Sequence, residues 1–92
     1  MPSDAYGDQL QTAMTLLGRG GFAACVRGDG RARFVYAVYG ARAIELSGDD
    51  PGFFAEFFAE PHESSVRLDR YSTLETATEA ARHWLSGGHH NA

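Results

Sequence analysis

Residues 22–46, FAACVRGDGRARFVYAVYGARAIEL, decide the fold of this chain. They hold three runs rich in β-branched and aromatic residues, which favour strands. Gly28-Asp29-Gly30 and Gly40-Ala41 separate these runs and are typical of tight turns, because glycine accepts positive φ without strain. Strands joined by such short connections pair antiparallel with their neighbours in the chain. The stretch therefore predicts a three-stranded antiparallel meander.

Helices are predicted on both sides of this meander. Residues 3–17 repeat apolar side chains at helical spacing, at Tyr6, Leu10, Met14 and Leu17. Residues 74–85 carry a second apolar stripe, and the capping sequence Ser72-Thr73-Leu74-Glu75 comes just before it. Residues 65–71 alternate apolar and charged side chains, which predicts one more strand ahead of that helix.

A short helix is predicted for residues 53–58, FFAEFF. The four phenylalanines, Phe53, Phe54, Phe57 and Phe58, have the i, i+1, i+4, i+5 spacing of a broad helical face. A strand fits this segment poorly, because both of its faces would carry phenylalanine. Asp49-Asp50-Pro51-Gly52 is typical of a helix start, and Pro61 would end the helix.

The expected order is α-β-β-β-α-β-α, a two-layer α+β domain with helices on one face of an antiparallel sheet of about four strands. A single domain over residues 1–88 would be followed by a flexible tail, residues 89–92. The helix-facing side chains are predicted to be Phe22, Phe34, Tyr36, Val38, Ile44, Leu46, Val66 and Leu68. The opposite face is predicted to carry Ala23, Cys25, Arg27, Arg31, Arg33, Val35, Ala37, Tyr39, Glu45, Arg67, Asp69 and Tyr71.

Charge is distributed in two blocks. All eight cations are arginines, and five of them lie between Arg19 and Arg42 against one acid, Asp29. Residues 43–66 hold six acids and no cation, and the whole chain has a formal net charge of −4. A small domain polarised in this way attracts an oppositely charged partner to one side.

Candidate catalytic and metal-binding groups are sparse. Glu79 and His83 stand one helical turn apart and could share a metal, but a third ligand would have to come from His89 or His90, in a tail that nothing fixes. Structural zinc sites usually take four ligands, often thiolates, and this chain has one cysteine. His62 and Glu63 are adjacent, yet no serine or cysteine nucleophile in a recognisable motif accompanies them. We therefore predict no enzyme activity, no metal and no cofactor.

A cytoplasmic location is expected. Cys25 is the only cysteine, so no internal disulfide can form, and this suits a reducing compartment. The start, Met1-Pro2-Ser3-Asp4, lacks the basic and apolar regions of a signal peptide. No apolar run reaches the ~20 residues that a membrane-spanning helix requires, so no membrane partner is expected.

Two surfaces are predicted to bind a partner. The first is an acidic surface formed by Asp49, Asp50, Glu56, Glu60 and Glu63, which would dock on a basic region of another protein. The second is the sheet face, with Arg27, Arg31, Arg33, Tyr39, Arg67 and Tyr71, because arginine and tyrosine are enriched at interface hot spots. An ordinary solvated surface remains the alternative for both, and a homodimer is left open.

The sequence thus predicts a small acidic protein-binding module, acting as an adaptor, regulator or inhibitor. In size and charge alone it is similar to phage-encoded inhibitors of nucleic-acid machinery, such as anti-CRISPR proteins. The alternative is a nucleic-acid-binding domain that uses the arginine-rich hairpin and the exposed sheet face. The element order of this chain is similar to that of double-stranded RNA-binding domains. Those domains place lysines at the start of the final helix, where this chain has Thr73-Leu74-Glu75-Thr76. The acidic pI near 5.4 also disfavours phosphate binding.

Overall fold

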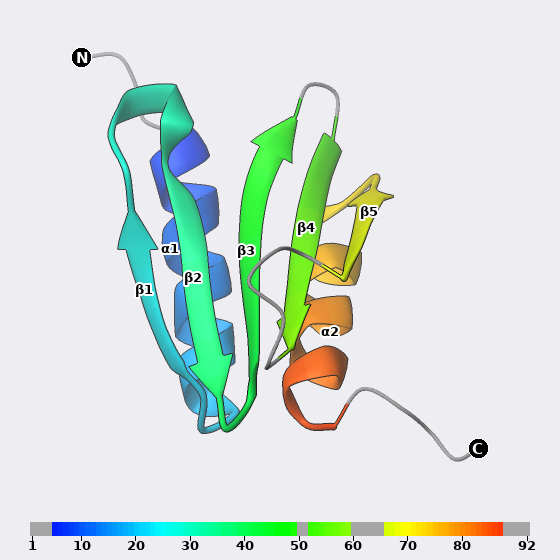
Figure 1. Ribbon diagram of the computed structural model, residues 1–92. Coiled ribbons are helices and arrows are strands. Elements are labelled where there is room, and N and C mark those ends of the chain that lie inside the picture. The colour runs from blue at the N-terminus through cyan, green and yellow to red at the C-terminus, as the bar shows by residue number, and fades with distance from the viewer. Residues whose placement is uncertain (1–4, 50–51, 60–65, 88–92) are drawn as a thin grey trace.

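The computed structural model describes residues 5–49, 52–59 and 66–87. Two helices pack on one side of a five-stranded sheet (Figure 1). The elements are α1 (Ala5–Arg19), β1 (Ala23–Arg27), the 3₁₀ turn η1 (Gly30–Ala32), β2 (Phe34–Tyr39), β3 (Arg42–Asp49), β4 (Gly52–Ala59), β5 (Arg67–Tyr71) and α2 (Leu74–Leu85). The predicted α+β class, with a helix at each end and the strands between them, is confirmed.

The sheet is an antiparallel meander in the order β1-β2-β3-β4-β5. Glycines with positive φ form the first two connections, at Gly28 (88°) before η1 and at Gly40 (59°) between β2 and β3. A Cβ atom on Gly28 would also lie 2.6 Å from the carbonyl oxygen of Ala32, so a larger residue would force the turn apart. The meander predicted for residues 22–46 is confirmed, and it continues through β4 and β5.

The core fills the space between the sheet and the two helices. α1 lies over β1 and β2, α2 lies over β3, β4 and β5, and the helices also contact each other. The buried apolar residues are Leu10, Ala13, Leu17, Phe22, Val35, Ala37, Ile44, Leu46, Ala55, Phe57, Ala77, Ala81 and Leu85. Alanines on both layers, such as Ala37 on the sheet and Ala81 on α2, leave room for the helices to pack against the sheet.

The prediction of a short phenylalanine-rich helix is wrong, because residues 52–59 form strand β4. β4 pairs with β3 over eight residues, from Arg42 opposite Ala59 to Asp49 opposite Gly52. This long ladder satisfies the backbone groups of β4, while a two-turn helix would have depended on packing alone. Phenylalanine on both faces was the reason for rejecting a strand, and the strand does carry it: Phe57 is buried against the helices, and Phe54 and Phe58 lie on the other face.

The predicted orientation of β2 is also wrong. Val35 and Ala37 are fully buried beneath the helices, so Phe34, Tyr36 and Val38 point to the opposite face. The side chains on both faces of β2 are apolar, so their alternation alone does not indicate which face is buried. The set with the smaller side chains faces the helix layer, where α1 packs close to the strand. Phe22, Ile44 and Leu46 do face the core as predicted.

Strand β5 is reversed in the same way. Leu68 is 47% exposed, and Val66, just before the strand, is 43% exposed, although both were expected to face inward. Arg67 pairs with the buried Phe57, so Arg67, Asp69 and Tyr71 lie on the helix side of the sheet. The Arg67 guanidinium lies over the Phe57 ring, with Cζ 4.3 Å from the ring centroid, and its Nε lies 2.8 Å from Oδ2 of Asp69.

One side chain ties α1 to two separate parts of the sheet. The Tyr6 hydroxyl donates a hydrogen bond to the carbonyl oxygen of Arg33 (2.6 Å) and accepts one from the amide of Gly48 (2.9 Å). A Cβ atom on Gly48 would lie 2.5 Å from the Tyr6 ring, so this contact requires glycine on β3. Tyr6 therefore holds the start of α1 against the entry of β2 and the end of β3.

We expect Tyr6→Phe to lower the free energy of unfolding by about 1–3 kcal/mol, because it leaves a partly buried amide and a carbonyl without their partner. Urea denaturation followed by circular dichroism measures the change. Tyr39→Phe is the matched control, because the Tyr39 side chain is 57% exposed. Equal stability of the two variants would contradict the role assigned to Tyr6.

Candidate functional site

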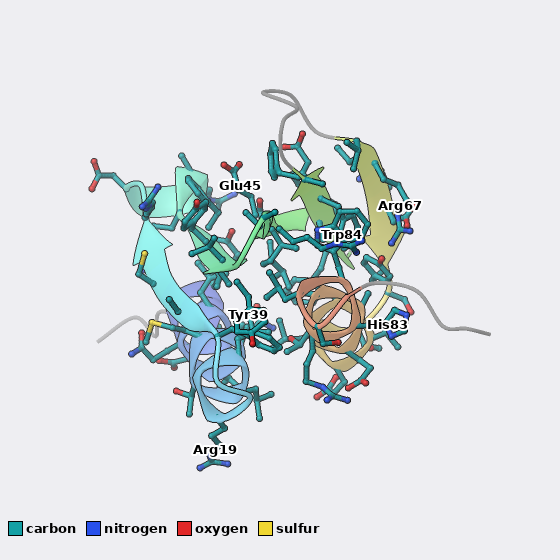
Figure 2. All side chains as sticks on the ribbon, turned by 60° about the horizontal axis from the view of Figure 1, so that its bottom comes forward. Arg19, Tyr39, Glu45, Arg67, His83 and Trp84 are labelled. Atoms are coloured by element: carbon teal, nitrogen blue, oxygen red, sulfur yellow. The ribbon has the colours of Figure 1, made fainter. Side chains whose placement is uncertain are left out.

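The sheet face turned away from the helices, which we call the open face, is the candidate functional site. Figure 2 shows Glu45 on this side, opposite α1 and α2. The middle row of side chains across the strands is Cys25, Tyr36, Glu45, Glu56 and Leu68. One flanking row contains Ala23, Val38, Ala43 and Phe58, and the other contains Arg27, Phe34, Ser47, Phe54 and Arg70.

Large apolar side chains are concentrated on the open face. Phe34, Tyr36, Phe54 and Phe58 are partly exposed, and Leu68 is 47% exposed. Within the described residues, none of the five belongs to the buried core or to the apolar side chains packed against it. The uncovered face of an antiparallel sheet is usually polar. A cluster of partly exposed aromatic rings is instead typical of an interaction surface.

Two carboxylates lie side by side at the centre of the open face. Glu45 on β3 and Glu56 on β4 are direct cross-strand partners. Neither forms an ion pair with another described residue. Burial, and then the charge of Glu56, raise the pKa of Glu45 above its ordinary value, while Arg27 opposes the shift. Like charges directly opposite one another destabilise a sheet, so this pair is retained at a cost in stability.

Two arginines stand at opposite sides of the open face, on the edge strands β1 and β5. The Arg27 guanidinium lies over the Tyr36 ring, with its Cζ atom 4.1 Å from the ring centroid. The Arg70 guanidinium lies 5.8 Å from the centroid of Phe54. Both arginines therefore extend the aromatic surface at its edges, by cation–π contact, and leave the two central carboxylates between them.

The structure separates most of the arginines and tyrosines predicted to share the sheet face. Arg27 does lie on the open face, whereas Arg31 is in η1. The Arg33 guanidinium lies 5.7 Å from the centroid of Tyr6, a residue of α1. Tyr39 packs edge-on against the buried Phe22, with ring centroids 5.3 Å apart. These residues therefore do not share one sheet face, because β2 and β5 turn the opposite set of side chains toward the open face from the set predicted.

Arg67 and Tyr71, the remaining two, lie on the helix side of β5. Arg67 contacts Phe57 and binds Asp69, as described above. Burial, and then the nearby Asp69, raise the pKa of Tyr71 above its ordinary value. Both residues belong to the edge of the core and are separate from the open face.

The predicted acidic surface is only partly visible in the structure. Glu56 lies at the centre of the open face, and Asp49 is the last residue of β3. Asp50, Glu60 and Glu63 lie outside the described residues, so their grouping with Glu56 stays a prediction. Among the described residues, the acid next to Glu56 is Glu45 on strand β3. Glu45 was not part of the predicted acidic surface.

Several open-face residues are not part of the two predicted binding surfaces: Phe34, Tyr36, Glu45, Phe54, Phe58, Leu68 and Arg70. One signal that could have found part of this set is the FFAEFF segment itself. When a strand carries phenylalanine on both faces, the rings on one face pack in the core and the rings on the other face are available to form a second apolar surface. The helical interpretation of this segment concealed the second set.

The other candidate sites have structural explanations. Glu79 is paired with Arg82 on α2, which occupies the carboxylate proposed as a metal ligand. No group of three or more metal-binding side chains occurs in residues 5–49, 52–59 and 66–87. His62, Glu63, His89 and His90 lie outside these ranges.

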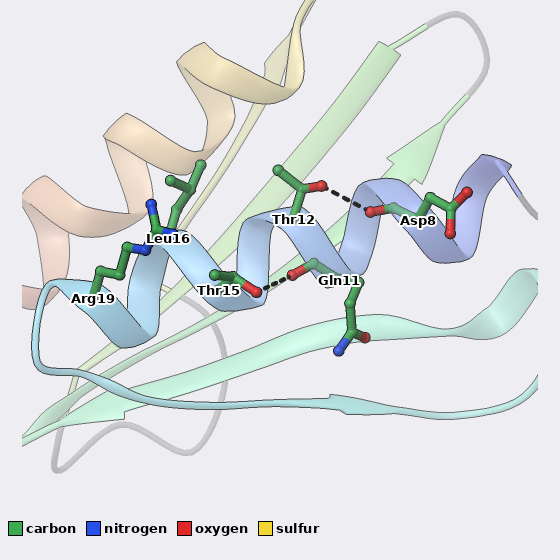
Figure 3. A pocket seen from close by; sticks show the side chains of 6 residues that line it. All are labelled: Asp8, Gln11, Thr12, Thr15, Leu16 and Arg19. Carbon is green, nitrogen blue, oxygen red and sulfur yellow. Dashed lines mark hydrogen bonds between the residues drawn. The ribbon is translucent and has the colours of Figure 1, made fainter.

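A shallow depression of about 480 Å³ runs along α1. Figure 3 shows its lining, which comes entirely from this helix: Asp8, Gln11, Thr12, Thr15, Leu16 and Arg19. Thr12 and Thr15 donate hydrogen bonds to the carbonyl oxygens one turn earlier, at 3.0 and 2.9 Å. These polar groups satisfy their own helix and do not converge on a ligand, so we interpret the depression as solvated surface.

Trp84 anchors α2 to the sheet on the helix side. Its Nε1 donates a hydrogen bond to the carbonyl oxygen of Phe58 (3.2 Å), and its ring packs edge-on against Phe57. The Arg42 guanidinium lies 4.2 Å from the Trp84 ring centroid, and Nη1 donates to the Trp84 carbonyl oxygen near the end of the helix. A cation at a helix C-terminus is stabilising, so this cluster serves the fold.

Comparisons with protein-family models, with curated proteins and with solved structures found no match for this chain. In the part of the chain that the structure describes, neither helix is long and apolar enough to cross a bilayer.

We expect Glu45→Gln to increase the free energy of unfolding at pH 7, by at most about 1 kcal/mol because both carboxylates are partly solvated. The folded-state pKa lies above the unfolded one, so ionised Glu45 costs stability above that pKa. This cost disappears as the pH falls below about 4, where both states are protonated. Urea denaturation of the variant and the parent at pH 7 and pH 3.5 measures the difference.

The double variant E45Q/E56Q tests whether repulsion between the two carboxylates causes the effect. If the Glu45–Glu56 repulsion contributes, E45Q/E56Q should gain less than the sum of the two single variants. A Glu45→Gln variant that is destabilised at pH 7, or whose effect is the same at both pH values, would contradict this account.

Proposed function

We propose that this chain is a non-catalytic protein-binding domain that contacts its partner through the open face. The observation that carries the proposal is the set of partly exposed aromatic rings on strands β2 and β4, which are not packed against the core. Burying such rings is a major source of binding energy at protein interfaces. A sheet also holds them on a rigid frame, so little conformational entropy is lost when a partner binds.

The chemistry of the open face favours binding over catalysis. Its central polar groups are the carboxylates of Glu45 and Glu56, and no described group of metal ligands accompanies them. Its cations, Arg27 and Arg70, lie at the edges over aromatic rings. Aromatic and arginine side chains around a few polar groups are typical of an interface.

We assign the domain a role as an adaptor, regulator or inhibitor, because binding is the activity that its surface supports. In the inhibitor case, it would cover a basic surface on its target, such as the nucleic-acid groove of another protein. We place it in the cytoplasm, where its lone, exposed Cys25 thiol would stay reduced.

Nucleic acid is the second candidate partner. Aromatic rings on a sheet stack on unpaired bases, and Arg27 and Arg70 would meet phosphates. The central Glu45–Glu56 pair and the net charge of −4 oppose phosphate binding, which makes this the weaker candidate. Labelled single-stranded DNA and RNA oligonucleotides, titrated at low salt, test it directly, and saturable binding that salt abolishes would favour it.

The test of protein binding uses the full chain as bait for a random peptide library displayed on phage. Enriched peptides are then synthesised, and their affinities for the parent chain and for two leucine variants are measured by fluorescence anisotropy. We expect Leu68→Ser, on the open face, to weaken binding about tenfold, or about 1.4 kcal/mol. Leu16→Ser, on the exposed side of α1, should leave affinity unchanged.

The two leucines form a matched pair, because they are 47% and 39% exposed and lie on different layers of the fold. Circular dichroism verifies that both variants are folded. The proposal fails if no peptide is enriched, or if Leu68→Ser binds the enriched peptides as tightly as the parent does.

A further inference from the structure

The centre of the open face has a charge that its apolar surroundings do not explain. Glu56 lies between Phe54 and Phe58 on the same face of β4, and its cross-strand partner is Glu45. Tyr36 and Leu68 complete the row on either side of the two carboxylates. A purely apolar partner placed here would remove both carboxylates from water and leave them unpaired, which is costly.

We infer that the open face recognises a basic segment of a partner protein, with an arginine or lysine seated on Glu45 and Glu56 and apolar neighbours resting on the surrounding rings. This inference rests on the proposed protein-binding function and adds the chemistry of the partner.

Charge complementarity selects this occupant. Side chains of direct cross-strand partners stand about 4.5–5.5 Å apart at Cβ, so two carboxylates there can share one guanidinium or ammonium group. A cation so placed would remove the repulsion between Glu45 and Glu56, which have no ion-pair partner among the described residues. The phenylalanines beside Glu56 would exclude water from the contact, which strengthens it.

The other occupants fit this face less well. A second copy centred on the same face would bring four carboxylates together, because it presents the same Glu45–Glu56 pair. Its own cations, Arg27 and Arg70, already lie over Tyr36 and Phe54. A nucleic acid would bring phosphates to a surface whose centre is negative.

The experiment extends the peptide selection with charge variants of the full chain. The E45Q/E56Q variant removes both charges and keeps the side-chain shape. The control is Asp8→Asn/Glu75→Gln, which changes the net charge equally but on the two helices. We expect the peptides selected by the parent to share an arginine or lysine flanked by apolar residues. E45Q/E56Q should weaken their binding at least tenfold, and the control should change it less than twofold.

A reciprocal change in the peptide identifies the contact. Replacing its shared basic residue with glutamine should weaken binding to the parent at least tenfold and have little effect on E45Q/E56Q. This pattern is expected only if that residue and the two carboxylates interact directly.

The outcomes distinguish a failure of this inference from a failure of the proposed protein-binding function. If the enriched peptides lack basic residues, or bind E45Q/E56Q as well as the parent, while Leu68→Ser still weakens them, the inference is overturned and the protein-binding function stands. If no peptide depends on Leu68, both fail.

Sedimentation of the parent chain tests whether a second copy of the chain binds the open face. A dimer that dissociates on Leu68→Ser would assign the face to self-association and overturn the inference. A parent chain that stays monomeric supports it, because the face is then free for a different partner.

Discussion

The burial of Phe57 is the interaction on which the arrangement of the sheet depends. Its side chain is fully buried, its ring packs edge-on against Trp84, and it pairs with the equally buried Ile44. Side chains alternate along a strand, so fixing Phe57 inward sends its neighbours Glu56 and Phe58 outward. A slip of one residue would exchange the two faces of β4, and the loss of this core contact opposes such a slip. The aromatic and acidic composition of the open face thus follows from a contact on the other side of the sheet.

Much of the fold could be predicted from the sequence. The two amphipathic helices have a clear period, and the glycine turns between β1, β2 and β3 predict the meander. β4 escaped prediction because phenylalanine on both faces of a six-residue segment matches a helical pattern better than the one-sided pattern expected of a strand. Its assignment depends on β3, whose eight-residue ladder is a non-local partner that a local pattern does not include.

The candidate site was harder to predict than the fold. Which face of β2 is buried depends on how closely α1 approaches Val35 and Ala37, and this is a property of packing between distant segments. Once β2 is inverted, Tyr36 joins the open face and Tyr39 leaves it. Of the residues predicted for the two binding surfaces, Arg27 and Glu56 lie on the open face. A charged binding surface stays a proposal, and its residues differ from those predicted.

The bond between Trp84 and β4 also gives this protein an optical property. Trp84 is the only tryptophan of the chain, and its indole nitrogen donates to the backbone of Phe58, whose side chain belongs to the open face. The emission of an indole responds to its hydrogen bonding and to the polarity around it. A sheet is a single layer of backbone. Only this layer lies between the Trp84 indole on the helix side and the open face on the other side. The molecule thus carries its own spectroscopic reporter directly behind the open face, without a label.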